Sequence, residues 1–369
     1  MTSPARRVVL CLDLDAFFAS VEIADDPALA DPRRPLAVGS PDPHRGVIST
    51  ASYAARAYGV RSGMSTAEAL RRCPALRVVP TRHERYAEAS EQVFAILRRV
   101  TDQIEPASVD EAYLDATGVL APGQEPAVLA AELRRVIKAE TRLTASIGIG
   151  AGKRMAKIAC DRAKPDGILT IPAGTERAFL APLPVSVISG VGPKTTAVLA
   201  SNAITTCAEL AATDPSHLRR WFGPKGAWMR DAAAGIDLDP VTPHRGQRSV
   251  GAEMTMETNT AATEALEALL AALAADVARR LERAGLFARG VTLKLRDADF
   301  RTITRSASIP DGTADAEVLL AAGCELLARE AGSRVFRLVG LTATGLAEGE
   351  QLRLFAREVS FGAPPAGAA

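Results

Sequence analysis

The chain has 369 residues, 47% of them hydrophobic, and its 44 Lys and Arg nearly balance its 43 Asp and Glu. This length predicts two to four domains with real apolar cores. No stretch approaches the roughly 18 uncharged apolar residues of a membrane span. A net charge of +1 argues against binding polyanions with the whole surface, but it leaves room for a local basic face.

Cysteine usage and the N-terminus both favour the cytoplasm. The five cysteines form no C-x-x-C pair, and the four histidines show no zinc spacing, so we expect reduced, structural thiols. The first apolar run is interrupted by Asp13 after five residues, which is too short for a secretory signal.

The first strand ends in acids and aromatic rings. The apolar run Val8–Leu12 predicts a buried strand, which Asp13, Asp15, Phe17 and Phe18 follow directly. An ionised carboxylate in a low-dielectric place is costly unless something pairs with it. Something must therefore pair with the acids at this strand end.

A second acidic cluster contains Asp110 and Glu111. On a regular strand they would point to opposite faces, so both can line one site only if the chain bends, and nearby Pro106 favours a bend. Together with Asp13 they would place three carboxylates in one cleft, and like charges this close need a cation. Hard oxygen ligands suit Mg²⁺ or Mn²⁺. Such a site supports phosphoryl transfer. The alternative is that these are unrelated acids in turns.

Candidate phosphate contacts lie between and after these clusters. Ser49, Thr50, Tyr53 and Arg56 would fall within two helical turns, with Tyr53 and Arg56 on one face. Arg56 offers a planar fork for phosphate oxygens, and Lys164 offers a point charge. Each cation alone could equally be a solvated surface residue.

The rest of the chain divides by composition. Residues 1–170 alternate strand and helix patterns, and residues 172–240 form short helices separated by Gly, Pro and Asp. A proline-containing linker follows at 239–249. Residues 248–345 show the order β-α-β-β-α-β, after which periodicity is lost.

Six ordered stretches carry a family resemblance: CLDLDAFFASVE, RGVISTASYAARAYGVRSGM, SVDEAYLD, KRMAKIACDRAKPDG, ISGVGPKTT and SVGAEMT. They resemble the Y-family DNA polymerases, most closely their bacterial DNA polymerase IV branch, the DinB type. The resemblance implies an α+β multidomain right hand. Its expected parts are a palm (1–15 and 82–171), fingers (16–81), a helical thumb with a helix-hairpin-helix (172–240), a linker (241–247), a βαββαβ little finger (246–346) and a tail (347–369).

The resemblance also implies site roles. Two Mg²⁺ ions, which Mn²⁺ can replace, would be held by Asp13, Asp110 and the carbonyl of Leu14, with Glu111 as the catalytic glutamate. Phe18 would be the steric gate against a 2′-hydroxyl, while Phe17 packs inward. The nucleotide-binding set is Phe18, Thr50, Tyr53, Arg56 and Lys164. Ala57 and Gly152 depart from the family's usual Lys and Asn.

DNA contacts are expected in two places. The loop Ser189–Lys194 resembles a helix-hairpin-helix, although an ordinary capping turn is the alternative. In the last domain basic residues lie on strands and acids on helices, which favours a phosphate-tracking sheet face over a merely solvated one. The predicted DNA-binding residues are Gly190, Gly192, Lys194, Lys294, Arg296, Arg305 and Arg337.

The tail holds QLRLF, which resembles a sliding-clamp docking peptide. Gln351, Leu352, Leu354 and Phe355 would bind the clamp, unless they cap the last strand. We expect a monomeric cytoplasmic DNA polymerase that adds deoxynucleotides to a primer 3′ end on a DNA template, with low fidelity, translesion synthesis and no room for a proofreading exonuclease. The rivals are a palm-type nucleotidyl cyclase and an inactive DNA-bound adaptor.

Overall fold

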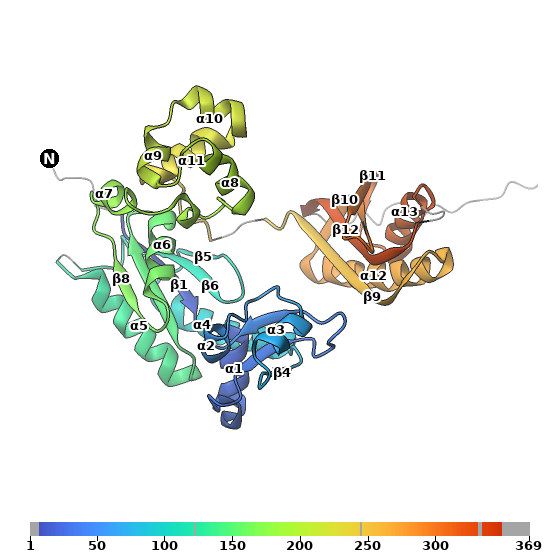
Figure 1. Cartoon of the computed structure of the whole chain (residues 1–369), viewed down its shortest axis with the longest axis horizontal. Coiled ribbons are helices and arrows are strands. Elements are labelled where there is room, and N and C mark those ends of the chain that lie inside the picture. The colour runs from blue at the N-terminus through green and yellow to red at the C-terminus, as the bar shows by residue number, and fades with distance from the viewer. Residues whose placement is uncertain (1–6, 122, 244–245, 331–333, 349–369) are drawn as a thin grey trace, which may run out of the picture. The chain divides into compact units, whose positions relative to one another are not determined.

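The computed structural model describes residues 7–121, 123–243, 246–330 and 334–348, and the chain divides into two compact units, residues 1–245 and 246–369. Strands and helices occur in both units, which confirms the expected α+β class (Figure 1). Within the described ranges, no helix is long and apolar enough to cross a membrane.

A five-stranded sheet with the order β5-β6-β1-β7-β8 forms the centre of the first unit. Its strands are β1 (Val9–Leu14), β5 (Ile104–Pro106), β6 (Glu111–Asp115), β7 (Ala145–Gly150) and β8 (Ile168–Thr170). The helices around it are α1 (Phe17–Asp25), α4 (His83–Arg98), α5 (Pro126–Thr141) and α6 (Lys153–Ala163). The sheet is antiparallel except where β7 pairs with β8.

Strand β1 is buried along its whole length because helices cover both of its faces. Its leucines pack in one cluster with side chains of α4 and α5. Val9 and Cys11 pack instead against residues of α6. Because successive strand residues alternate between faces, Asp13 belongs to the α6 face.

Helix α6 lies very close to the sheet because β7 contains glycines. A Cβ on Gly148 would lie 2.0 Å from the carbonyl oxygen of Ala156 in α6, so only glycine allows this approach. The close packing brings the inner face of α6 over the ends of β1 and β6.

A small sheet with the order β3-β2-β4 was not predicted from the sequence. Its elements are β2 (Leu36–Gly39), β3 (Ile48–Ala51) and β4 (Arg77–Val79), with α2 (Tyr53–Ala57), α3 (Thr66–Arg72) and a 3-10 turn, η1 (Pro27–Ala30). Ser49 and Thr50 lie on β3, so the prediction that they share a helix with Tyr53 and Arg56 is wrong. Short strands of small residues carry too little periodicity to be recognised.

Short helices follow in residues 172–240, as the composition predicted. They are α7 (Glu176–Leu180), the 3-10 turn η2 (Val185–Val187), α8 (Pro193–Ser201), α9 (Cys207–Ala212), α10 (Pro215–Phe222) and α11 (Lys225–Ala233). Their apolar side chains form a separate core cluster that also includes Met155 and Ile158 of α6.

The chain after α11 packs against the first unit as far as Thr242, so the first residues of the expected linker belong to that unit. The Asp237 carboxylate accepts a hydrogen bond from the N–H of Arg154 at 2.7 Å and so caps α6. A Cβ on Gly152 would lie 2.7 Å from the same carboxylate, which accounts for glycine at this position. Val241 is buried, and the N–H of Thr242 donates to Glu105 at 2.8 Å.

The second unit confirms the order β-α-β-β-α-β. Its elements are β9 (Ser249–Thr260), α12 (Thr263–Ala284), β10 (Leu286–Asp297), β11 (Thr302–Thr313), α13 (Ala316–Ala328) and β12 (Phe336–Glu348). The antiparallel sheet has the order β11-β10-β12-β9. Side chains of α12 and α13 pack with one face of the sheet in a single core cluster, to which β10 contributes Val291, Leu293 and Leu295.

We predict that the buried ion pair at the anchored segment is important for stability. Lys153 Nζ lies 2.9 Å from the Glu105 carboxylate, and both side chains are nearly inaccessible. Glu105→Gln would leave a buried ammonium without its partner, so the free energy of unfolding should fall by about 3–5 kcal/mol. The control is Glu140→Gln, which breaks an exposed ion pair with Arg99 and should cost less than about 1 kcal/mol. Equal urea midpoints for the two variants would contradict the prediction.

Candidate active site

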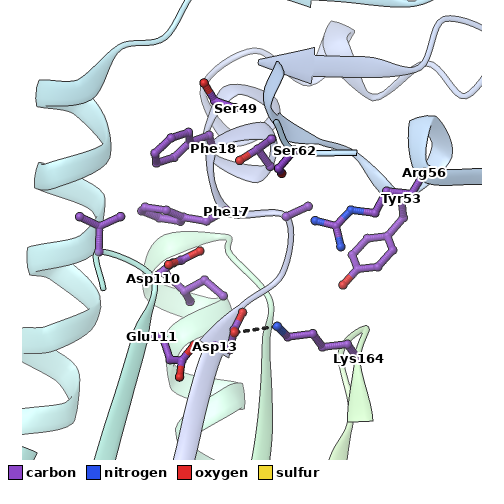
Figure 2. A pocket seen from close by; sticks show the side chains of 14 residues that line it. Asp13, Phe17, Phe18, Ser49, Tyr53, Arg56, Ser62, Asp110, Glu111 and Lys164 are labelled. Atoms are coloured by element: carbon purple, nitrogen blue, oxygen red, sulfur yellow. Dashed lines mark ion pairs between the residues drawn. The ribbon is translucent and has the colours of Figure 1, made fainter. Parts of the chain in front are cut away.

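The predicted catalytic glutamate and all eight residues predicted to bind metal ions or nucleotide line one cavity of about 370 Å³ in the first unit. They are Asp13, Leu14, Phe18, Thr50, Tyr53, Arg56, Asp110, Glu111 and Lys164. Figure 2 shows the three acids gathered near Lys164, with Tyr53 and Arg56 beside each other on another wall. Residues more than 150 positions apart therefore converge, which the sequence alone could only suggest.

The three acids are brought together by backbone pairing. Asp13 of β1 lies directly opposite Glu111 of β6, so their side chains share a face. Asp110 lies just before β6, in a bend, and its carbonyl accepts the N–H of Leu14 at 2.9 Å. This bend lets two consecutive acids line one cavity.

Two lysines provide positive charge to the carboxylates. Lys157 Nζ lies 2.9 Å from Asp13 and 2.7 Å from Glu111, and Lys164 Nζ lies 2.6 Å from Asp13. Burial opposes the charged form of Lys157, but attraction to Asp13 and its bond to Glu111 outweigh it and raise its pKa above the ordinary value. The sequence analysis missed Lys157.

The carboxylates of Asp13, Asp110 and Glu111 are not arranged around a single point in this structure. Asp110 accepts a hydrogen bond from Ser108, while Asp13 and Glu111 face Lys157. Among the described residues, no group of three acid, histidine or cysteine side chains is arranged to hold a metal ion. The donors are nevertheless all hard oxygens on one cavity wall, which suits Mg²⁺ or Mn²⁺.

Asp15 is stabilised by neutral donors instead of a cation. Its buried carboxylate accepts hydrogen bonds from Tyr53 Oη at 3.2 Å, Ser146 Oγ at 2.9 Å and the Asp166 N–H at 2.9 Å. Burial and the charge of Asp15 raise the pKa of Tyr53 to about 12. Asp15 thus positions Tyr53 and does not line the cavity.

Phe18 is held by a network that sequence reasoning missed. Its ring stacks on Tyr86, with centroids 4.1 Å apart and planes 14° apart, whereas Phe17 is buried as expected. The Tyr86 hydroxyl donates to Glu22 at 2.6 Å, and Arg82 donates to the same carboxylate at 2.7 Å. The only sequence signal was an acid on an otherwise apolar face of α1.

The guanidinium of Arg56 is oriented by its surroundings. Its Nε donates to the carbonyl of Ala51 at 3.0 Å, and its Cζ lies 4.7 Å from the centre of the Tyr53 ring. These two contacts hold Arg56 on the cavity wall, where a planar cation can meet phosphate oxygens.

The glycine-rich loop between η2 and α8 has a geometry that needs glycine. Gly190 has a φ of +92°, and a Cβ there would lie 3.1 Å from the Trp228 ring. Its carbonyl accepts a hydrogen bond from Lys225 Nζ at 2.8 Å. Gly192 caps α8, and Lys194 is exposed in its first turn.

The open face of the second unit's sheet carries Lys294 and Arg296, opposite the face that the helices cover. Lys294 forms an ion pair with Glu253 at 2.5 Å, so part of its charge is neutralised. Arg337 lies with its Cζ 4.8 Å from the centre of the Phe300 ring.

Arg305 was expected on the same basic sheet face as Lys294 and Arg296, but it does not lie on that open face. It pairs across the sheet with the buried Leu293, and its guanidinium binds Glu330 at 2.7 Å. The clamp-binding residues predicted at 351–355 lie outside the described residues.

Comparisons with known proteins identify the family of the chain. The impB/mucB/samB family model matches residues 12–161, and the model of that family's C-terminal domain matches residues 247–354. Proteins named DNA polymerase IV from Halorhodospira halophila and Akkermansia muciniphila are 42% and 41% identical to this chain. Each alignment covers 92% of this chain, and 95% and 94% of those proteins.

Solved structures resemble the chain as well. A Y-family DNA polymerase chimera, Dbh-Dpo4(243-245)-Dbh, matches with a TM-score of 0.84 and 25% identity, covering 93% of this chain and 100% of that one. An insertion ternary complex of Dbh DNA polymerase matches in fold with a TM-score of 0.67. With relatives at this identity over nearly their whole length, the chain belongs to the impB/mucB/samB family, the Y-family DNA polymerases.

Proposed function

We propose that this protein adds deoxynucleotides to a primer 3′ end on a DNA template and releases diphosphate, using two divalent metal ions. The observation that carries the proposal is the cavity in which three carboxylates, an arginine, a lysine and an aromatic ring meet. Family membership supports low fidelity and synthesis past damaged bases, without proofreading. We propose that the enzyme acts as a monomer in the cytoplasm.

The carboxylates would hold the metal ions. Asp13, Asp110 and the carbonyl of Leu14 are the proposed ligands, and Glu111 is the proposed catalytic glutamate beside them. When bound, the pair of ions supplies a polarised primer hydroxyl and charge neutralisation at the leaving diphosphate. Glu111 lies opposite Asp13 across two paired strands, so it can orient the primer end against this cluster.

The other cavity residues would hold the nucleotide. Arg56 and Lys164 can bind triphosphate oxygens, and Thr50 can donate a hydrogen bond from its hydroxyl. Tyr53 would contribute its ring beside Arg56, and its hydroxyl can donate to a phosphate only by releasing Asp15. The Phe18 ring would lie against the sugar and leave no space for a 2′-hydroxyl. Stacking on Tyr86 keeps that ring in one orientation, which a steric filter requires.

DNA would be bound through phosphates. The proposed contacts are the loop residues Gly190, Gly192 and Lys194, and the sheet residues Lys294, Arg296 and Arg337. Backbone N–H groups at a glycine turn and basic side chains on an open sheet face bind phosphates without reading sequence. Binding of this kind falls steeply with added salt, and it suits an enzyme that must accept any template.

Removing one proposed metal ligand should abolish synthesis without affecting DNA affinity. Asp110→Asn removes a carboxylate of the same size, and primer extension should fall by about a thousandfold. Asp102→Asn, an exposed acid that does not line the cavity, is the control and should be neutral. Primer extension and DNA binding are measured together. Substantial extension by Asp110→Asn would remove the metal assignment.

Removing the proposed gate should change sugar selection. Phe18→Ala should raise ribonucleotide insertion relative to deoxynucleotide insertion by about a hundredfold, because the space beside the 2′ position opens. Tyr58→Ala removes an exposed ring that does not line the cavity and serves as the control. Single-nucleotide kcat/KM ratios provide the measurement, and an unchanged ratio in Phe18→Ala would mean that another residue selects the sugar.

We also propose that Gln351, Leu352, Leu354 and Phe355 dock on a sliding clamp. Replacing Leu354 and Phe355 by alanine should abolish stimulation of synthesis by the clamp and leave clamp-free extension unchanged, since apolar anchors dominate such peptide docking. Arg357→Ala is the matched control. Full stimulation of the double variant on circular primed DNA would refute docking through this segment.

A further inference from the structure

We call Asp13, Asp110 and Glu111 the carboxylate cluster, and Lys157 forms ion pairs with two of these acids. Its Nζ lies within 3.0 Å of three acids, namely Asp13, Glu111 and Asp161. Its side chain is only 17% exposed. Lys157 does not line the cavity, whereas Lys164 does. The two lysines therefore approach the acids differently, and Lys157 approaches from the α6 side.

The two acids on this face of the sheet favour a nearby cation, and Lys157 is paired with both of them, whereas Lys164 is paired with Asp13. Asp13 is 8% exposed and lies directly opposite Glu111, so two negative charges share one face of the sheet. Like charges this close raise the free energy of the ionised pair unless a positive charge is near. Gly148 lets α6 approach the sheet, and this approach brings Lys157 to both acids.

We propose that Lys157 is the resident counter-charge of the carboxylate cluster and that it limits the cluster's affinity for divalent cations. This inference rests on the proposed function, because it assumes that metal ions bind at Asp13 and Asp110. An arriving ion must share Asp13 with an ammonium group or displace it. Lys157 is thus a positioning residue that holds Asp13 and Glu111 in place between catalytic cycles.

Loss of the Lys157 charge should lower the melting temperature of the metal-free protein and raise its affinity for a divalent ion. Without the ammonium group, the metal-free protein loses the lysine partner of Glu111 and one of the two lysine partners of Asp13, so it should melt at a lower temperature. The same loss removes repulsion toward a divalent ion a few ångströms away, so the ion should bind more tightly. A residue with a purely structural role would lower the melting temperature and weaken metal binding together.

The test is a Mn²⁺ titration of the full chain without DNA or nucleotide, with free Mn²⁺ followed by electron paramagnetic resonance. Lys157→Met should bind Mn²⁺ about tenfold more tightly than the unchanged chain. Its melting temperature should be lower in chelator and should recover with saturating Mn²⁺. Lys157→Arg retains the charge and should keep the original affinity. Lys138→Met removes a charge from an exposed lysine that pairs with Asp166, and it is the matched control.

The outcomes separate the inference from the proposed function. Equal or weaker Mn²⁺ binding by Lys157→Met overturns the inference and leaves the metal site intact. Mn²⁺ binding that is identical in the unchanged chain and in Asp110→Asn shows instead that the metal ligands named in the proposed function are wrong. Should Lys157→Met fail to fold, Lys157→Gln retains a hydrogen-bond donor toward Glu111 and is held to the same criterion.

Discussion

The structure of the first unit depends on how the negative charges at the end of the buried strand β1 are compensated. Strand β1 is covered on both faces, yet it carries Asp13 and leads directly into Asp15. The two acids are stabilised differently. Asp15 accepts hydrogen bonds from neutral groups and is fixed in place, whereas Asp13 and Glu111 face the ammonium group of Lys157. The first arrangement is structural, and the second is the one that the proposed metal site would use.

Helix α6 connects this charge balance to the rest of the unit. Its middle supplies Lys157 to the acids, and its first turn supplies Lys153 to the buried Glu105. Its N-terminus is capped by Asp237, which lies beyond the short helices. One helix therefore links the acidic end of β1 with the chain that follows the short helices, and a glycine in β7 makes its close packing feasible.

How far the sequence predicts such a structure can be judged from particular residues. The acids, the ring pair and Arg56 stand in motifs, and all of them reach one cavity. Arg305 was grouped with Lys294 because both are basic and on strands. On β11, Ile303, Ala307 and Ile309 lie on the face that packs against the core, and Arg305 has the same two-residue spacing. This spacing indicates from the sequence that Arg305 starts from the core side of the sheet. Charge alone does not say which face a residue occupies.

The sequence by itself determined the family, the order of strands and helices in the second unit, and the residue types that can bind metal ions and phosphate. These follow from local spacing and from residue identity, which need no knowledge of neighbours. Only the tertiary structure decided that Asp110 and Glu111 share a cavity through a bend, that Tyr86 and Glu22 hold Phe18, and that Lys157 faces Asp13 across 144 positions. Periodicity encodes which side of an element is buried, but the partner on that side is set by how distant elements pack.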